Sequence, residues 1–235
     1  TFKHSQQIAN TIEVVATQIG LDPDLMKKCG MYHDIGKSLF PQIFTENQPV
    51  GQNINENLLP EISYFLITRH VSDSVMILIN DESVPREMIE IISQHHGTTI
   101  CKSLWNKVKD QDKFNIDDFR YKTMRPSSVE AMVLMLVDVL EATSRSYFQN
   151  HKEFDPVELV HSVITSHLQD GQFDEVQMKL RLLAKIEEVL AADVAGSFQK
   201  RVDYGDAPAT KKKIKDKKIL TNIRKTSTSI NYLIF

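Results

Sequence analysis

The stretch "SSVEAMVLMLVDVLEA", residues 127–142, decides the fold, because it joins a helix start to a long apolar run. Ser127 and Glu130 have the spacing of a capping box, in which two side chains satisfy backbone N–H groups of the first helical turn. The run that follows is apolar on all sides, which is typical of a core helix. One carboxylate, Asp138, interrupts this run. Since a buried charge is costly without a partner, we expect Asp138 to bind something inside the protein.

Helical patterns continue on both sides of this run. Apolar residues three and four apart, such as Ile8, Ile12 and Val15, predict an amphipathic helix over residues 5–19. Asp22 and Pro23 begin a second helix, which Gly36 is placed to stop. Further helices are predicted to begin at Pro60, Pro85, Asp155-Pro156 and about Asp174. The helix that begins at Pro85 is predicted to end at Gly97, and the last helix at Lys200.

Strand-length alternation of apolar and polar residues is absent from the sequence. We therefore predict one all-α helical bundle over residues 1–203, followed by a basic, flexible tail over residues 204–235. Two polar connections, residues 39–59 and 109–126, are long for simple links. They favour a lid or a substrate wall outside the helical core.

The composition is that of a soluble globular protein, with 41% apolar and 25% charged residues. Two cysteines, Cys29 and Cys101, argue against a disulfide framework and for a reducing compartment. No run of about 18 apolar residues is evident, so we expect no membrane-spanning segment. Because the chain lacks a starting Met and a signal-peptide pattern, we interpret it as part of a longer protein.

The charge is unevenly distributed along the chain. Residues 201–235 hold nine Lys or Arg against three Asp, a balance of +6, so the net charge of −3 leaves −9 on residues 1–200. An acidic body argues against a general DNA- or RNA-binding protein. The basic tail is interpreted as a solvated extension, with contact to anionic lipid or RNA as the alternative.

Two short stretches hold the residues best suited to chemistry. "YHDIGK", residues 32–37, contains His33 and Asp34, and "SQHHGTTI", residues 93–100, contains His95 and His96. A surface histidine beside a core histidine would explain an isolated pair. However, the chain also places ionisable residues on other apolar helices or ahead of them, namely His4, His70 and Asp138.

Five histidines and two carboxylates have the composition of a two-metal site. Imidazole nitrogen with carboxylate oxygen suits iron or manganese, and zinc is the alternative. Two such ions, about 3.5–4 Å apart, promote in-line attack on phosphorus by lowering the pKa of a bridging water. Asp34 has two oxygens with which to bridge the ions. Lys37, one turn further, would neutralise a phosphate oxygen or only stabilise the helix end.

The order H…HD…H…HH…D resembles the metal-dependent HD-domain phosphohydrolases. The stretches "TFKHS", "YHDIGK", "FTENQ", "ITRHVSDSV", "QHHGTT", "VDVLEATSRS" and "DGQFDE" are similar to the cytoplasmic catalytic domain of the seven-transmembrane-receptor HD family of the PgpH type. This resemblance covers about residues 1–200. It implies hydrolysis of cyclic di-AMP to linear pApA by a metal-bridging hydroxide at a di-iron or di-manganese centre.

The resemblance also implies a role for each matching residue. His4, His33, Asp34 and Asp138 would bind one metal, and Asp34, His70, His95 and His96 would bind the other. Thr98 would border the substrate. From its position one to two turns after Asp138, and not from the resemblance, Arg145 is expected to contact a phosphate or to brace the helix of Asp138. Trp105 is expected to pack in the core, and His151, His161 and His167 to have surface or capping roles.

The family further implies a missing upstream membrane and sensor region, so that this soluble part would lie at the cytoplasmic face of the bacterial inner membrane. The oligomeric state stays open, with a homodimer among the alternatives. The chain has "HHGTTICKSLW" where cyclic di-GMP enzymes of the HD-GYP type continue with HHE and GxGYP. Alternative functions are an HD phosphohydrolase for cyclic di-GMP, a dNTP or an alarmone, and a catalytically silent nucleotide sensor.

Overall fold

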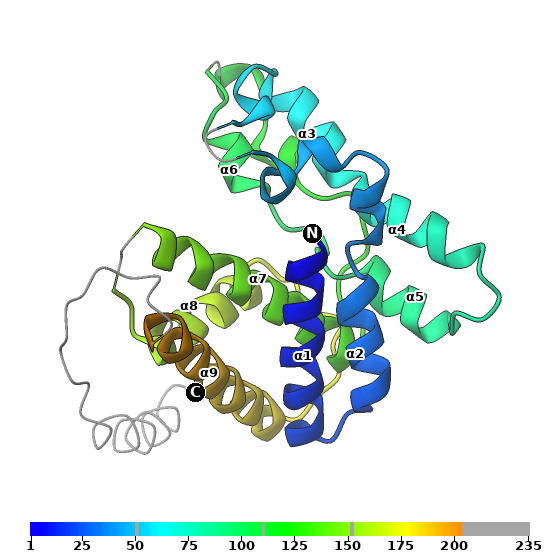
Figure 1. Ribbon diagram of the computed structural model, residues 1–235, viewed down its shortest axis with the longest axis vertical. Helices are drawn as coiled ribbons and strands as arrows, with labels where there is room; N and C mark the ends of the chain where they lie inside the picture. The colour runs from blue at the N-terminus through cyan, green and yellow to red at the C-terminus, as the bar shows by residue number, and fades with distance from the viewer. Residues whose placement is uncertain (50–51, 110, 151–152, 204–235) are drawn as a thin grey trace.

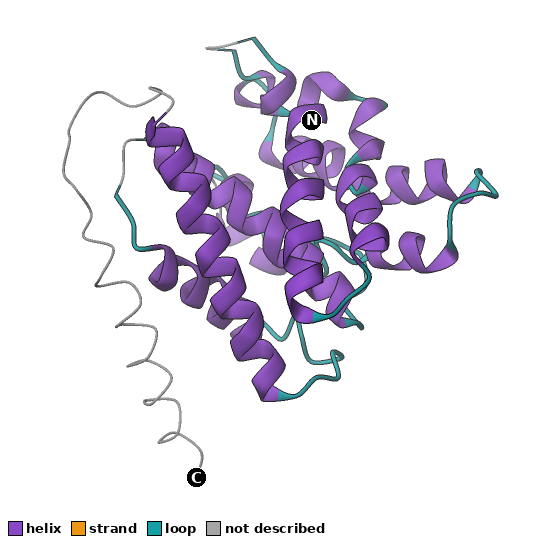
Figure 2. Cartoon of the chain, turned by 60° about the horizontal axis from the view of Figure 1, so that its bottom comes forward, coloured by secondary structure: helices purple, strands orange, loops and turns teal. Residues whose placement is uncertain are grey.

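The computed structural model describes residues 1–49, 52–109, 111–150 and 153–203. Within these ranges the chain is helical, and the isolated bridge between Ile100 and Arg120 is its one strand-like pairing. Figure 2 shows helices and loops throughout the described residues. The all-α prediction is therefore confirmed. The predicted tail, residues 204–235, lies outside the described residues.

The α-helices are α1 (Phe2–Ile19), α2 (Pro23–Tyr32), α3 (Pro60–Thr68), α4 (His70–Ile79), α5 (Arg86–Ser93), α6 (Lys102–Trp105), α7 (Val129–Gln149), α8 (Pro156–Gln169) and α9 (Leu180–Asp203). Short 3-10 turns lie between them at Ile35–Ser38, Pro41–Ile43, Thr45–Asn47, Ile54–Glu56, Gln111–Lys113 and Ile116–Phe119.

Helix α7 forms the centre of the fold. Seven consecutive residues, from Ala131 to Val137, are at most 2% exposed, which confirms the core helix predicted from its apolar run. Its N-cap is Ser128, whose hydroxyl accepts a hydrogen bond from the Ala131 N–H. The predicted capping box at Ser127 is therefore wrong by one residue. Ser127 instead donates from its backbone N–H and its hydroxyl to Oε1 of Gln94.

Helices α1, α2, α5, α8 and α9 surround α7 (Figure 1). α1 packs along α2 on one side and against α9 and α7 on the other. A smaller cluster of Leu104, Val108 and Phe119 lies under α3 and α6, and Trp105 packs against it, as predicted. The site described below lies between these two regions, where α4, α5 and the start of α1 meet α7.

Several helix boundaries differ from the prediction. α2 ends at Tyr32 rather than near Gly36, and α5 ends at Ser93 rather than at Gly97. The long final helix begins at Leu180, not near Asp174, because residues 170–175 form turns. In the first two cases the residues released from the helix include His33, His95 and His96, which are thereby free to face away from the helix surface.

Gly36 does not act as a helix stop. A Cβ atom at Gly36 would lie 2.2 Å from the His70 carbonyl oxygen and 2.5 Å from the Ser74 backbone nitrogen. The Gly36 N–H donates to the Ser74 hydroxyl, and that hydroxyl donates to the His33 carbonyl. Glycine therefore allows the turn after α2 to touch the first turn of α4, which brings Asp34 and His70 together.

The two long connections are partly buried, contrary to the expectation that they lie outside the core. Ile43 and Phe44 of the first connection are 7% and 6% exposed, and Phe119 and Tyr121 of the second are 2% and 8% exposed. Phe44 packs edge-on against the His70 ring. Both connections therefore form walls of the site.

By length and composition, Pro60–Ile79 is apolar enough to cross a membrane, which we did not expect from the sequence. This is weak evidence for a span, since core helices of soluble proteins meet the same criterion. The stretch divides at Arg69 into α3 and α4, and Arg69 pairs with Asp73 in the next turn. His70, at the start of α4, points at the Asp34 carboxylate.

Candidate metal centre

All seven side chains predicted as metal ligands lie together. His4 comes from α1, His33 and Asp34 from the turn after α2, His70 from the start of α4, His95 and His96 from the turn after α5, and Asp138 from α7. Six of the seven are less than 9% exposed as whole residues, and the side chain of His96 is 17% exposed. Distant parts of the sequence therefore build one buried polar cluster.

Asp34 lies at the middle of this cluster. Its Oδ2 is 3.3 Å from His33 Nε2 and 3.7 Å from His4 Nε2. Its Oδ1 is 3.3 Å from His70 Nε2 and 4.0 Å from His95 Nε2. The two oxygens of one carboxylate thus face two different groups of histidines, which is the arrangement that a bridging ligand needs.

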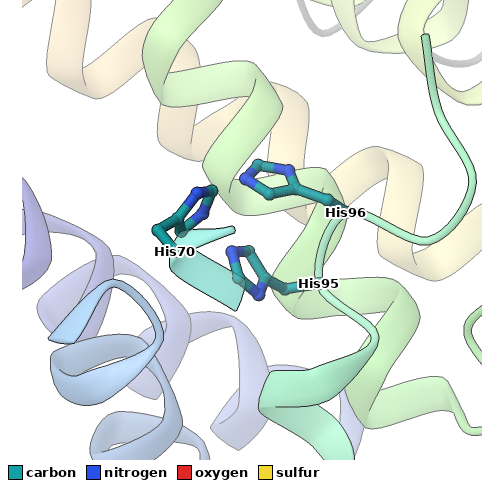
Figure 3. Close-up of side chains that lie close together, drawn as sticks. All are labelled: His70, His95 and His96. Carbon is teal, nitrogen blue, oxygen red and sulfur yellow. The ribbon is translucent and has the colours of Figure 1, made fainter. Parts of the chain in front are cut away.

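The other ligands divide into two groups around Asp34. Ligand atoms of His70, His95 and His96 lie within 4.8 Å of one another, as do those of His4, His33 and Asp138. Figure 3 shows the rings of the first group turned toward a common point. Each group offers three ligand atoms to one ion, with Asp34 as a shared fourth.

Three histidines are held with Nε2 pointing into the site. The Nδ1–H groups of His33, His70 and His95 donate to the carbonyls of Gly30, Ile67 and Ile92, each three residues earlier, at 2.7, 2.6 and 2.6 Å. This leaves each Nε2 with its lone pair free. All three Nε2 atoms are buried without a hydrogen-bond partner. Because a buried polar atom without a partner is costly, these atoms fit a bound metal.

His4 has a different outer partner. Its Nδ1–H donates to Glu141 Oε2 at 2.9 Å, and its Nε2 lies 3.0 Å from Asp138 Oδ1. Arg145 lies 3.6 Å from the same Glu141 oxygen. A carboxylate behind a histidine is a common support for a metal ligand, since it fixes the ring and raises its basicity. Glu141 was not predicted from the sequence, although it lies on the face of Asp138, three residues later in α7.

The pKa values of the site residues differ from one another in the metal-free protein. Burial would lower the pKa of His4, but hydrogen bonds to Asp138 and Glu141 outweigh it and raise the pKa to about 9, so His4 must release a proton when it binds a metal. Burial, together with His33 and His70, lowers the pKa of His95 to about 3. Burial would raise the pKa of Asp34, yet the charges of His33 and Lys37 hold it well below its usual value. The carboxylate is therefore ionised and His95 is neutral, as metal ligands must be.

Lys37 lies beside the bridging carboxylate. Its Nζ is 2.6 Å from Asp34 Oδ2 and 3.2 Å from Glu46 Oε1, and it sits over the Phe44 ring. Burial would lower the Lys37 pKa, but the charges of Asp34 and Glu46 raise it, so the ammonium stays charged. Glu46 and Phe44 belong to the 39–59 connection, which thereby contributes to the site.

Tyr121 covers the His96 side of the site. Its ring stacks on His96 with centroids 4.3 Å apart and contacts the edge of His70 at 6.2 Å. Tyr121 was not predicted from the sequence, because only the folded 109–126 connection brings it to the histidines.

The remaining predicted residues lie further out. Thr98 follows the His pair, and its N–H and hydroxyl bind the side chain of Gln172. His161 pairs with Glu187 at the surface, and His167 donates to the Val163 carbonyl and stacks on Phe173. His151 lies outside the described residues. Cys29 and Cys101 are free thiols.

The comparisons with known proteins agree with this arrangement. A model of the HD domain matches residues 1–143. The chain is 34% identical over 216 residues to the cyclic-di-AMP phosphodiesterase PgpH of Bacillus subtilis, an alignment that covers 92% of this chain and 30% of that protein. It is 33% identical over 207 residues to PgpH of Listeria monocytogenes, covering 88% and 29%. The chain thus spans about a third of the length of these relatives.

A solved structure has the same fold. The crystal structure of the L. monocytogenes phosphodiesterase PgpH HD domain in complex with cyclic-di-AMP superimposes with a TM-score of 0.75 and 33% sequence identity. The match covers 83% of this chain and 91% of that one. As its motifs predicted, the chain belongs to the HD-domain family and is similar to the HD domains of the PgpH type.

Proposed function

We propose that this domain hydrolyses cyclic di-AMP to linear pApA, breaking a P–O3′ bond and leaving a 5′-phosphate end. The observation that carries the proposal is the set of buried Nε2 atoms without partners around Asp34. The phosphodiesterase names of its relatives support the reaction, and the cyclic-di-AMP complex of the similar HD domain supports the substrate.

Two divalent ions, iron or manganese by the chemistry of the donors, would supply activation of water and neutralisation of phosphate charge. His4, His33 and Asp138 would hold one ion, and His70, His95 and His96 the other. Asp34 would contribute one oxygen to each. The backbone carbonyls behind His33, His70 and His95, and Glu141 behind His4, hold the rings in the required tautomers.

The substrate would enter on the more exposed side of the cluster. Side-chain exposure is 17% for His96, 14% for Lys37 and 23% for Glu46, against 0–6% for the other four histidines. Lys37 is among these more exposed groups, and its ammonium stays charged. We propose that it receives a phosphate oxygen once it releases Asp34.

The two proposed substrate contacts, Thr98 and Arg145, occupy different positions. Thr98 lies beside the turn that carries His95 and His96, but its hydroxyl is engaged by Gln172. Arg145 is one turn from Glu141, on the far side of His4. Bracing of Glu141 is the role that this geometry favours for Arg145.

The test is anaerobic purification, metal quantification and chromatography of products. The protein is incubated with cyclic di-AMP and, separately, cyclic di-GMP in the presence of Mn²⁺ or Fe²⁺. About two metals per chain, with pApA formed from cyclic di-AMP alone, is the expected result. If two metals are bound but neither dinucleotide is cleaved, the proposed substrate becomes a dNTP or an alarmone. Incubation with a panel of nucleotides then identifies which of these is hydrolysed.

A catalytically silent sensor is the second candidate. It would bind the nucleotide tightly and release no product with either metal.

We further propose, from the resemblance, that the domain acts at the cytoplasmic face of the bacterial membrane, attached to a sensor region. An acidic body favours the small nucleotide over DNA or RNA. Size-exclusion chromatography with light scattering tests for a homodimer.

A further inference from the structure

The turn that carries His95 and His96 lies beyond the end of α5. Helix α5 ends at Ser93, and residues 94–97 form a turn in which the Gly97 N–H donates to the Gln94 carbonyl. Gly97 has a φ of +53°, a left-handed conformation that favours glycine. Two ligands of one group therefore depend on a short turn, and other parts of the chain must hold it in place.

Gln172 holds this turn from behind. Its side chain is fully buried, and its Oε1 accepts a hydrogen bond from the Thr98 N–H at 2.9 Å. Its Nε2 donates to the Thr98 hydroxyl at 3.0 Å and to Asp170 Oδ2 at 2.8 Å. Since a backbone N–H can only donate, the orientation of the amide is fixed. A Cβ atom at Gly97 would lie 2.4 Å from Oε1, so the amide packs directly on the glycine.

A second layer fixes the same segment. Arg120 binds both oxygens of Asp170, at 3.0 and 2.8 Å, and its Nη1 also donates to the Thr98 carbonyl at 2.8 Å. The Thr123 hydroxyl donates to the Gly97 carbonyl at 2.5 Å. Both backbone groups of Thr98 are thus held, its N–H by Gln172 and its carbonyl by Arg120.

Gln172 also lies outside residues 1–143, the part of the chain that the HD-domain model matches. It belongs to the turn after α8, where its own N–H donates to the His167 carbonyl. The network therefore connects a C-terminal segment to two of the seven proposed ligands.

We propose that Gln172 is a positioning residue for the metal group formed by His70, His95 and His96. By fixing Thr98, it sets the direction of the two adjacent imidazoles. This inference rests on the proposed function, because it takes that group to hold an ion. Supporting groups of this kind commonly change metal affinity by about 10- to 100-fold when removed.

The experiment is calorimetric titration of the metal-free protein with Mn²⁺ alone. His95→Ala identifies which of two binding steps belongs to this group. In Gln172→Ala, that step is expected to weaken about tenfold or more, while the other step keeps its affinity. Gln172→Met, which keeps about the same length but makes none of these hydrogen bonds, is expected to weaken the same step as Gln172→Ala, and it provides a second variant if Gln172→Ala does not fold.

Asp155→Ala is the matched control. Asp155 caps the start of α8 by accepting from the Val157 and Glu158 N–H groups, at the opposite end of α8 from the turn that holds Gln172. Its loss lowers stability without touching the turn. If Gln172→Ala weakens both steps equally, or leaves both unchanged, the positioning role is wrong. A wild-type protein that binds fewer than two ions would overturn the two-metal proposal itself, and this inference with it.

Discussion

Glu141 accepts a hydrogen bond from Nδ1 of His4 at 2.9 Å, across 137 residues of sequence. Both side chains are 6% exposed, so water screens the pair poorly. The bond turns Nε2 of His4 toward Asp138 and Asp34, where the group of His4, His33 and Asp138 lies. Glu141 is therefore part of the support of the site, although it is not one of the seven ligands.

Replacing Glu141 by Gln tests this support. Gln has the same shape but lacks the charge, so the His4 ring is held less firmly and is less basic. We expect the ion at His4, His33 and Asp138 to bind about 10- to 100-fold more weakly, and the other ion to bind as before. Titration with Mn²⁺ measures both steps. Glu130→Gln, at the start of the same helix, is the control, and equal affinities in wild type and Glu141→Gln would contradict the expectation.

Asp34 has one carboxylate oxygen facing each of the two proposed metal groups. We expect Asp34→Asn to lose turnover and at least one metal, because an amide supplies only one oxygen and no charge. Metal quantification and product chromatography on the same sample measure both effects. Asp22→Asn is the control, since Asn caps a helix as well as Asp does. Full activity of Asp34→Asn in a metal-replete sample would refute the proposed bridge.

The sequence was sufficient to single out several of the proposed ligands, because these residues disturb a local pattern. Asp138 interrupts an apolar helix, and His95 and His96 precede a glycine, so their unusual surroundings are visible without a structure. Glu141, Tyr121 and Gln172 lack such a signal. Their roles come from tertiary contacts, which bring α1 to α7, the 109–126 connection to His96, and the turn after α8 to Thr98.

Helix ends were less predictable for a related reason. Glycine in a helical pattern indicates a stop only when it adopts a left-handed conformation, as Gly20 does at the end of α1. Gly36 instead allows the chain to pack closely against α4. The neighbour that requires a glycine there is the His70 carbonyl, 34 residues later in the sequence. Local sequence does not distinguish these two uses.

Gly36→Ala tests that packing. The added methyl group would meet backbone atoms of His70 and Ser74, which cannot move without shifting α4. We expect the free energy of unfolding of the metal-free protein to fall by about 1–3 kcal/mol or more, measured by urea denaturation. Gly196→Ala in α9 is the control, because no atom lies within 4 Å of the new methyl group. There we expect a gain of about 0.5–1 kcal/mol, and equal effects of the two substitutions would contradict the expectation.

His167 gives a pH dependence separate from the metal centre. Burial lowers its pKa below the usual value near 6.5, so the unfolded chain takes up a proton more readily than the folded one. The stability associated with the neutral ring is present above about pH 6.5 and is lost as the pH falls. His167→Gln should therefore reduce the loss of stability between pH 7.5 and pH 5.5, roughly the span around that pKa. Ser166→Ala, exposed on the same helix, should keep the wild-type slope, and identical slopes for all three proteins would exclude this role.

Substitution of Lys37 is expected to affect metal binding and turnover differently. In the structure its ammonium lies 2.6 Å from the Asp34 oxygen that faces His33 and His4, so it competes with a cation for that oxygen. Lys37→Met keeps the length and removes the charge. We therefore expect Mn²⁺ to bind at least as tightly as in wild type, whereas turnover falls by about 10- to 1000-fold because a charge near the phosphate is lost. Lys27→Met, which breaks a surface pair with Glu13, is the control. Weaker metal binding together with unchanged turnover would show that Lys37 supports the site instead of acting on the substrate.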